Sequence, residues 1–166
     1  MITRRGYVYC VIACCFAFAA CRGKRTSTTD INPDNKTLPF DQGGRIVSKY
    51  FTGEVHLNML VDADSIYNMN VGNVSFQRGA RTNWHSHPGG QILMVTSGIG
   101  FYQEKDKPKH IIKAGDIIKC APNVLHWHGA TPEDTMAHIA IGPNLNKGSV
   151  SWQEAVTDSV YHSVLK

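Results

Sequence analysis

Alternation of apolar and polar residues is the feature of this sequence that most limits its fold. It runs through six segments between about Ile46 and Gly142: EVHLNMLV, GNVSFQ, GQILMVTSG, GFYQEK, KHIIKAGDIIKC and TMAHIAIG. Period-two alternation places apolar side chains on one face of a β-strand, and turns with Gly, Pro or Asn separate the segments. Many short strands in one small domain predict an all-β sandwich or barrel, in which closure removes exposed strand edges.

The bulk properties agree with one folded domain. The chain has 166 residues, of which 42% are hydrophobic and 18% are charged, which suits a single hydrophobic core. Near the C-terminus, Ser151 precedes Glu154 by three residues, the spacing of a capping box, which predicts a short helix from Ser151 to about Val156. The net charge of +4 is modest and no basic stripe with interleaved aromatic residues is present, which argues against nucleic acid as a partner.

The first residues have the pattern of a targeting signal. The pair Arg4-Arg5 precedes an apolar run over residues 7–20 that is too short to span a membrane comfortably. The run leads into FAAC, residues 18–21, which resembles the lipobox of bacterial lipoproteins. That resemblance implies that residues 1–20 are removed as a signal peptide and that Cys21 is lipidated. An ordinary apolar anchor is the alternative interpretation.

The cysteines fit the lipoprotein interpretation. Cys10, Cys14 and Cys15 would leave with the signal, and Cys21 would carry the lipid. Only Cys120 would then remain, so no intramolecular disulfide could form even in an oxidising compartment. Cys120 is interpreted as a small buried apolar side chain.

A polar segment follows the predicted lipidation site. Residues 22–44 contain two prolines and a Gly-Gly pair and show almost no apolar periodicity, which predicts a flexible tether over residues 21–44 and a folded domain over residues 45–166. The tether begins with RGKR rather than with the acidic cluster of surface-exported lipoproteins. We therefore expect a lipid anchor on the periplasmic side of the bacterial cell envelope.

Two His-x-His pairs carry the strongest chemical signal. On a strand, residues i and i+2 face the same side, so His85 projects with His87 and His126 projects with His128. Gln91 follows a Pro-Gly-Gly break that could fold it back beside the first pair. Imidazoles that converge in an apolar cavity require hydrogen-bond partners or a cation, and a divalent transition metal satisfies several at once. Hydrogen-bonded core residues without a metal are the alternative.

The spacing of these residues resembles a known family. Gly79, His85-x-His87, Gln91 and Gly98 match the first motif of the cupins, with glutamine in place of the usual acidic ligand, and GDIIKCAPNVLHWH resembles the second motif. The second motif departs from the family pattern at Ala121-Pro122-Asn123 and at Ala130. The resemblance implies a jelly-roll barrel, or double-stranded β-helix, in a single cupin domain. It implies the metal ligands His85, His87, Gln91 and His126.

A narrower resemblance is carried by FTG, GARTNWHSHPGGQ, HWHGA, MAHIAI and SWQEAVTD. These stretches are similar to small single-domain bacterial cupins that include manganese-dependent hydroxynitrile lyases and carboxymuconolactone decarboxylase-associated cupins. The similarity implies manganese as the metal, although the ligand types also suit iron, cobalt, nickel and zinc. It maps the pocket histidines of that group onto His128 and His138, which are candidate general bases or, alternatively, structural histidines.

The predicted ligands bear on the chemistry. Three imidazoles and one amide are all neutral, so they leave the full charge of a divalent ion available as a Lewis acid. The expected function is a lyase-type reaction on a small hydroxy or carbonyl compound, by proton transfer and carbon–carbon cleavage. A non-catalytic cupin that binds or senses a small molecule, and a metal-dependent dioxygenase, are the alternatives.

Three residues near the predicted ligands have open interpretations. Arg81 is compatible with a clamp for an anionic substrate or with a salt bridge. Trp84 and Trp127 each adjoin a predicted ligand and therefore point away from the cavity. Exposed tryptophans are costly, so both are expected to pack against another layer or a second subunit, and we predict a homodimer.

Overall fold

The computed structural model describes residues 40–164. The predicted signal peptide 1–20, the predicted lipidation site Cys21 and the predicted tether up to residue 39 lie outside the described residues. Within residues 40–164, no helix is long and apolar enough to cross a membrane.

Strands form almost all the regular structure, which confirms the all-β prediction. The described residues form a 12-stranded sheet in which every strand pairing is antiparallel. The strands are β1 (Gly44–Arg45), β2 (Phe51–Thr52), β3 (Val55–Val61), β4 (Met69–Phe76), β5 (Arg81–Thr82), β6 (His85–Ser86), β7 (Gln91–Glu104), β8 (His110–Lys113), β9 (Ile117–Cys120), β10 (His126–Ala130), β11 (Met136–Pro143) and β12 (Ser151–Trp152). A 3₁₀-helix, η1 (Leu145–Lys147), and one α-helix, α1 (Asp158–Tyr161), complete the elements.

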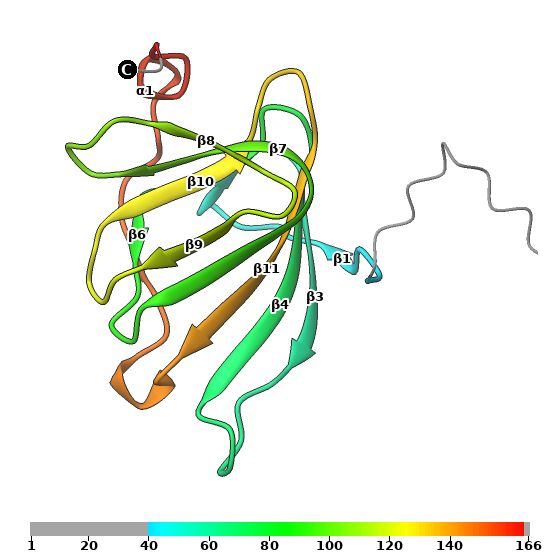
Figure 1. The fold of residues 1–166 in the computed structure, drawn as a ribbon, viewed down its shortest axis with the longest axis vertical. Coiled ribbons are helices and arrows are strands. Elements are labelled where there is room, and N and C mark those ends of the chain that lie inside the picture. Colours follow the sequence, from blue (N-terminus) through cyan, green and yellow to red (C-terminus); the bar gives the residue numbers. More distant parts are fainter. Residues whose placement is uncertain (1–39, 165–166) are drawn as a thin grey trace, which may run out of the picture. The chain divides into compact units, whose positions relative to one another are not determined.

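The long strand β7 belongs to both walls of the domain. Its first half pairs with β11 and β9, and its second half pairs with β10 and β8. The strand bends at Gly98, where φ is +70° and a Cβ would lie 1.8 Å from the carbonyl oxygen of Thr135, so only glycine fits. Figure 1 shows β3, β4 and β11 on one side of the interior and β10 with β6 on the other, joined by β7.

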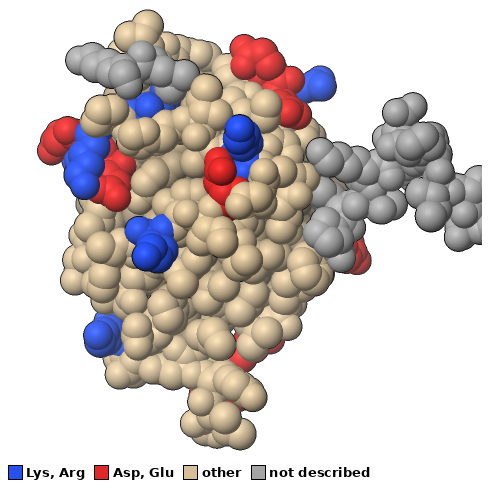
Figure 2. Space-filling view, in the orientation of Figure 1, with Lys and Arg blue, Asp and Glu red and all other residues tan. Residues whose placement is uncertain are grey.

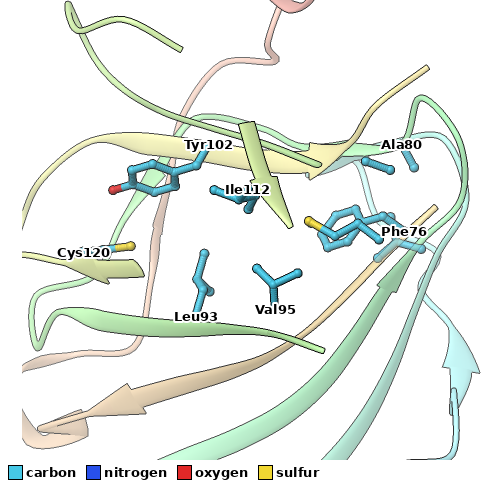
Figure 3. Close-up of a cluster of buried hydrophobic side chains, with 10 residues drawn as sticks. Phe76, Ala80, Leu93, Val95, Tyr102, Ile112 and Cys120 are labelled. Atoms are coloured by element: carbon cyan, nitrogen blue, oxygen red, sulfur yellow. The ribbon is translucent and has the colours of Figure 1, made fainter. Parts of the chain in front are cut away.

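Alternating side chains from both walls form the hydrophobic core shown in Figure 3. Leu93, Val95 and Tyr102 point inward from β7, and Phe76 and Ile112 meet them from β4 and β8. Burial of each large apolar side chain contributes about 1.5–3 kcal/mol relative to exposure. Cys120 is buried in the same cluster, as predicted.

The outer face of β10 is covered by the C-terminal segment of the same chain. Trp84 and Trp127 point away from the interior, as predicted, and form a second buried cluster with Val156 and Tyr161. The hydroxyl of Tyr161 donates a hydrogen bond of 2.7 Å to the carbonyl oxygen of Ala130, at the end of β10. Because this segment already covers both tryptophans, they give no reason to expect a second subunit, and the homodimer stays a prediction.

The predicted helix over residues 151–156 is wrong in its position. Ser151 and Trp152 form β12 and pair with Ser86 and His85 of β6. The pairing continues past the strand, because the amide of Gln153 donates to the carbonyl of Trp84. These tertiary hydrogen bonds outweigh the local capping signal. The short helix α1 begins only after Thr157, whose hydroxyl accepts a hydrogen bond from the amide of Val160.

Two buried cations hold the C-terminal segment in place. The guanidinium of Arg81 donates to the carbonyl of Val156 and lies 2.6 Å from the carboxylate of Asp158, so the salt-bridge interpretation of Arg81 is confirmed. The ammonium of Lys109 donates to the carbonyls of Tyr161 and Ser163. Each cation replaces lost hydration with carbonyl or carboxylate oxygens, as a buried charge requires.

Charged side chains are sparse on the face of the domain seen in Figure 2, where both signs are scattered over a broad uncharged area. Two apolar side chains of neighbouring strands are exposed together. Met94 of β7 is directly opposite Ile117 of β9, and their exposed fractions are 40% and 61%.

Candidate metal and catalytic site

A cavity of about 200 Å³ opens between the two walls of the domain. On the side of β3, β4 and β11 the lining is mostly apolar, with Leu57, Val74 and Ala140, and includes His138 of β11. The other histidines that line the cavity lie on the opposite side. Of the described residues, no Asp, Glu, Lys or Arg lines it. Five of the six predicted site residues line it: His85, His87, Gln91, His128 and His138.

The sixth predicted residue, His126, lies against this group. Its partner in the pairing of β10 with β6 is His85, and the centroids of the two rings are 4.3 Å apart. Nitrogen atoms of His85, His126 and His128 all lie within 4.8 Å of one another, a spacing that one metal ion could span. The strand pairing therefore brings the two His-x-His pairs together although about forty residues separate them in the chain.

Three of the histidines have the same protonation pattern. The Nδ1 atoms of His85, His87 and His126 lie 2.9, 2.7 and 2.9 Å from the backbone carbonyl oxygens of Asn83, Ser149 and Val124, respectively. A carbonyl oxygen can only accept, so Nδ1 carries the proton in each ring and a neutral ring keeps a lone pair on Nε2. This is the arrangement of histidines that bind a metal through Nε2.

His87 supplies the observation that tests the fit of a metal. Its Nε2 is buried and has no hydrogen-bond partner. A buried lone pair without a partner costs free energy, and a cation in the cavity would satisfy it. The residues present therefore fit a transition-metal ion.

Gln91 adds an oxygen to this group. It is the first residue of β7, and its Oε1 lies 3.2 Å from Nε2 of His126. Because Nδ1 of His126 already holds the ring proton, Nε2 and this amide oxygen face each other as two acceptors. A shared cation would resolve that conflict. Rotation of the amide, which would bring its NH₂ to Nε2, would resolve it too, so the orphaned nitrogen of His87 carries more weight.

His128 differs from the other histidines in the partner of its ring. Its Nδ1 lies 3.3 Å from Nε2 of His138, and no backbone carbonyl holds it. One of these two nitrogens donates to the other, so the two neutral rings are linked by a hydrogen bond. Nδ1 of His138 is buried without a partner. The hydroxyl of Thr82 donates to the backbone carbonyl of His128 and accepts from its amide, which fixes this part of β10.

Burial keeps these imidazoles uncharged at neutral pH. It lowers the pKa of His126 and of His138 to about 4. It also lowers the pKa of His87, and it lowers the pKa values of His85 and His128 well below the usual 6.5, with the neighbouring histidines as a further cause for the last two. Neutral rings are the form that can bind a metal or accept a proton.

Comparison with known proteins identifies the family. Residues 72–142 match the model of the cupin domain. The (R)-mandelonitrile lyase of Granulicella tundricola is 40% identical over 126 residues, which are 76% of this chain and 96% of that protein. The chain is a cupin.

Solved structures give the same answer. A cupin-like protein from Thermotoga maritima is 48% identical to this cupin, with a TM-score of 0.72 over 74% of this chain and 93% of that one. A second protein from the same organism, described as a predicted oxalate decarboxylase, is 22% identical and has a TM-score of 0.54 over 59% of this chain and 88% of that one. The second comparison shows only that the fold is shared.

Two sets of ligands can be drawn from this cupin's site, and they share His85 and His126. The sequence motif adds His87 and Gln91, whereas the shortest nitrogen separations add His128. His87 has a free Nε2 and an anchored Nδ1, whereas the ring of His128 already contacts His138. Hydrogen bonding therefore favours the motif's set, and the assignment stays a prediction.

Other parts of the site were not predicted. The carbonyl of Ser149 contacts His87, Trp152 lines the cavity, and the Trp152 ring lies 4.8 Å from that of His85. Residues 151–156 were expected to be helical, which gave Trp152 no place near the ligands. Nothing in the sequence connects Ser149 to His87, because the contact spans 62 residues and uses a backbone atom.

Proposed function

We propose that this cupin is a metal-dependent lyase of the hydroxynitrile lyase type. The observation that carries the proposal is the uncharged pair His128–His138, which lines the same cavity as the candidate metal ligands. A proton acceptor beside a Lewis acid suits cleavage of a bond next to a hydroxyl-bearing carbon. The similarity to an (R)-mandelonitrile lyase supports the choice of carbon–carbon cleavage among such reactions.

In this proposal His85, His87, Gln91 and His126 hold the metal, with manganese as the first choice. All four ligands are neutral, and a divalent ion bound to them supplies its undiminished charge to stabilise negative charge that develops on a substrate oxygen. Backbone carbonyls hold the three imidazoles, so their Nε2 atoms are oriented before the ion binds.

The pair His128–His138 moves the proton. A neutral His128 accepts the hydroxyl proton of a cyanohydrin while the bond to the nitrile carbon breaks. The electron pair of that bond leaves with cyanide, the former alcohol carbon becomes a carbonyl carbon, and cyanide takes up the proton. His138 contacts Nδ1 of His128 and stabilises the charge that forms transiently on the ring.

The cavity supports a small and uncharged substrate. Its volume of about 200 Å³ lies below the ~300–1,000 Å³ of sites for drug-sized ligands. Leu57, Val74 and Ala140 give the wall of β3, β4 and β11 an apolar area beside His138, and this area suits a hydrocarbon or aromatic group attached to the reacting carbon.

The proposal is tested with residues 22–166 purified with manganese and assayed for aldehyde release from mandelonitrile. We expect turnover in the wild type and a loss of roughly 10²–10⁴-fold in His128→Ala, the usual contribution of a general base. His110→Ala is the matched control, because His110 is exposed on β8. Metal-loaded wild type without turnover on aromatic or aliphatic cyanohydrins would contradict the lyase, and saturable binding without turnover would support the non-catalytic alternative.

We also propose a lipid anchor at Cys21 on the periplasmic side of the envelope, which the FAAC run and the basic residues after it support. Fractionation of cells that express the full chain tests this. The wild type should sediment with membranes and Cys21→Ser should not be lipidated. A wild-type chain without lipid would contradict the anchor.

The homodimer is the last part of the proposal, and the exposed pair Met94 and Ile117 supports it. A self-complementary apolar face is what a two-fold dimer buries. Analytical ultracentrifugation should give a dimer for residues 22–166 and a monomer for Ile117→Lys. Ile66→Lys is the control, because Ile66 is exposed on the loop between β3 and β4. A monomeric wild type would contradict the dimer.

A further inference from the structure

His87 depends on a remote part of the chain for its orientation, unlike the other two predicted imidazole ligands. His85 and His126 each donate from Nδ1 to the carbonyl of a residue two positions earlier. Their orientation is therefore a local property of their own strands. The ring of His87 donates instead to the carbonyl of Ser149, 62 residues further along.

The position of the Ser149 carbonyl is fixed from both sides. Before it, the amide of Gly148 donates to the carbonyl of Leu145 and closes the turn of η1. After it, β12 begins at Ser151, which pairs with Ser86, the neighbour of His87. The bond from His87 to Ser149 therefore closes a small loop between two fixed points.

Gly148 is the residue that lets the backbone take this path. Its φ is +112° with ψ of 157°, a conformation that is almost restricted to glycine. A Cβ at this position would also lie 3.3 Å from Cγ of Pro88, the residue after His87. Any other residue would have to turn the peptide that carries the carbonyl away from His87, or push against the loop that holds His87.

The contact between the two loops extends beyond this bond. The side-chain amide of Asn144 donates to the carbonyl of Gly89, and a Cβ on Gly89 would lie 2.1 Å from the carbonyl oxygen of Pro143. Figure 1 shows the loop with η1 beside the loop that leads into β7. The two loops therefore form one packed unit at the edge of the cavity.

We infer that Gly148 and the backbone carbonyl of Ser149 are positioning elements of the metal site. They hold the proton of His87 on Nδ1 and direct its Nε2 lone pair into the cavity. The inference rests on the proposed metal site. It adds that the site is completed by the C-terminal part of the chain, beyond the two sequence motifs that contain its ligands.

The loss of this carbonyl has a defined consequence. Without an acceptor at Nδ1, the neutral ring of His87 can move its proton to Nε2 or rotate, and either change removes the lone pair from the cavity. Partners of metal-bound histidines typically change metal affinity by about 10–100-fold when they are lost. Because Ser149 and Val150 also line the cavity, the same loop shapes the space for the substrate.

The test compares Gly148→Ala with a matched variant in residues 22–166. Gly115→Ala also replaces a glycine of positive φ, +96°, but its Cβ would meet nothing within 4 Å and it lies in the turn between β8 and β9. Manganese affinity, measured from the signal of the free ion in electron paramagnetic resonance, should fall about 10–100-fold in Gly148→Ala and stay unchanged in Gly115→Ala.

A second measurement reports on the imidazole itself and does not require the metal. Long-range ¹H–¹⁵N spectra of the metal-free protein should show His87 protonated at Nδ1 in the wild type and in Gly115→Ala. In Gly148→Ala the proton should appear at least partly on Nε2.

The outcomes separate this inference from the proposed function. Wild-type protein that binds no manganese, nickel or zinc would overturn the metal site and the inference with it. Wild-type protein that binds manganese, together with a Gly148→Ala variant of equal affinity and with the His87 proton still on Nδ1, would overturn the inference alone.

Discussion

The pairs His85/His87 and His126/His128 have the same spacing and lie next to each other, because β6 and β10 are paired strands, yet the two pairs are held differently. Both rings of the first pair donate from Nδ1 to backbone carbonyls, one local and one remote. In the second pair, only His126 does so, and His128 contacts another imidazole. Identical spacing therefore places side chains together, and in our proposal the partner of Nδ1 distinguishes the metal ligands from the imidazole that moves a proton.

The largest effect that follows from this comparison is the loss of His126. It belongs to both possible ligand sets, and its removal would leave Gln91 without its neighbour in the site. His126→Ala should lose bound manganese, with a fall in affinity beyond the about 10–100-fold expected for an outer partner, and all turnover with it. Metal analysis by mass spectrometry checks this, with His162→Ala as an exposed control. A variant that still holds one ion per chain would show that His126 is not required as a metal ligand.

His128 should behave in the opposite way to His126. With metal retained, His128→Ala should lower kcat by roughly 10²–10⁴-fold, because the ring is the proposed proton acceptor. Steady-state assays of the metal-loaded variant measure this. Unchanged kcat with full metal content would remove His128 from the reaction and leave it as a structural histidine.

The protonation of His138, the ring that contacts His128, should make the stability of the protein depend on pH. Burial lowers the pKa of His138 to about 4 from an ordinary value of 6.5. Between pH 4 and pH 6.5, His138 is therefore protonated in the unfolded chain and neutral in the folded protein. The free energy of unfolding should therefore fall as the pH drops from about 6.5 to about 4, by up to ~1.4 kcal/mol per pH unit for this group. Above pH 6.5 the contribution is constant.

Urea unfolding of the metal-free protein between pH 4 and pH 8 tests this contribution. His138→Gln keeps a hydrogen-bonding side chain but cannot take up the proton, so its stability should depend less steeply on pH than that of the wild type. Parallel pH profiles for the two proteins would show that His138 is not held neutral in the fold.

The smallest expected effect concerns the back of β10. Trp127, between the two histidines, is covered by the C-terminal segment, and the hydroxyl of Tyr161 donates to Ala130 at the end of the strand. Tyr161→Phe should lower the free energy of unfolding by about 0.5–1.5 kcal/mol and leave metal affinity unchanged, because this bond lies on the face away from the cavity. Tyr67→Phe, at an exposed loop position, should change neither quantity. A loss of metal affinity in Tyr161→Phe would mean that the two faces of β10 are coupled.

Much of the fold could be predicted from alternation, because burial of one face is a local signal. The predicted segments GQILMVTSG and GFYQEK are a single strand, β7, bent at Gly98. The alternation pattern cannot show whether a glycine such as Gly98 marks a bend within one strand or a turn between two strands, because glycine occurs in both. The helix at Ser151 was misplaced because pairing with β6 decides that segment, and strand pairing across a chain is not a local property.

For the candidate site, the sequence predicted which residues lie together. Five of the six predicted site residues line one cavity, and His126 lies beside them, with its Nε2 3.2 Å from Oε1 of Gln91. The roles of these residues are harder to predict from sequence, because they depend on tertiary contacts. One contact joins His87 to Ser149, 62 residues away, and the other joins His128 to His138 on a different strand. The division into ligands and bases therefore stays a prediction.

The most direct test of that division is the manganese affinity of His87→Ala measured beside that of His128→Ala. We expect His87→Ala to bind manganese far more weakly than the wild type and His128→Ala to bind it with nearly wild-type affinity. The reverse result, with affinity lost in His128→Ala and kept in His87→Ala, would show that His85, His126 and His128 hold the ion and would contradict the proposed roles of the two His-x-His pairs.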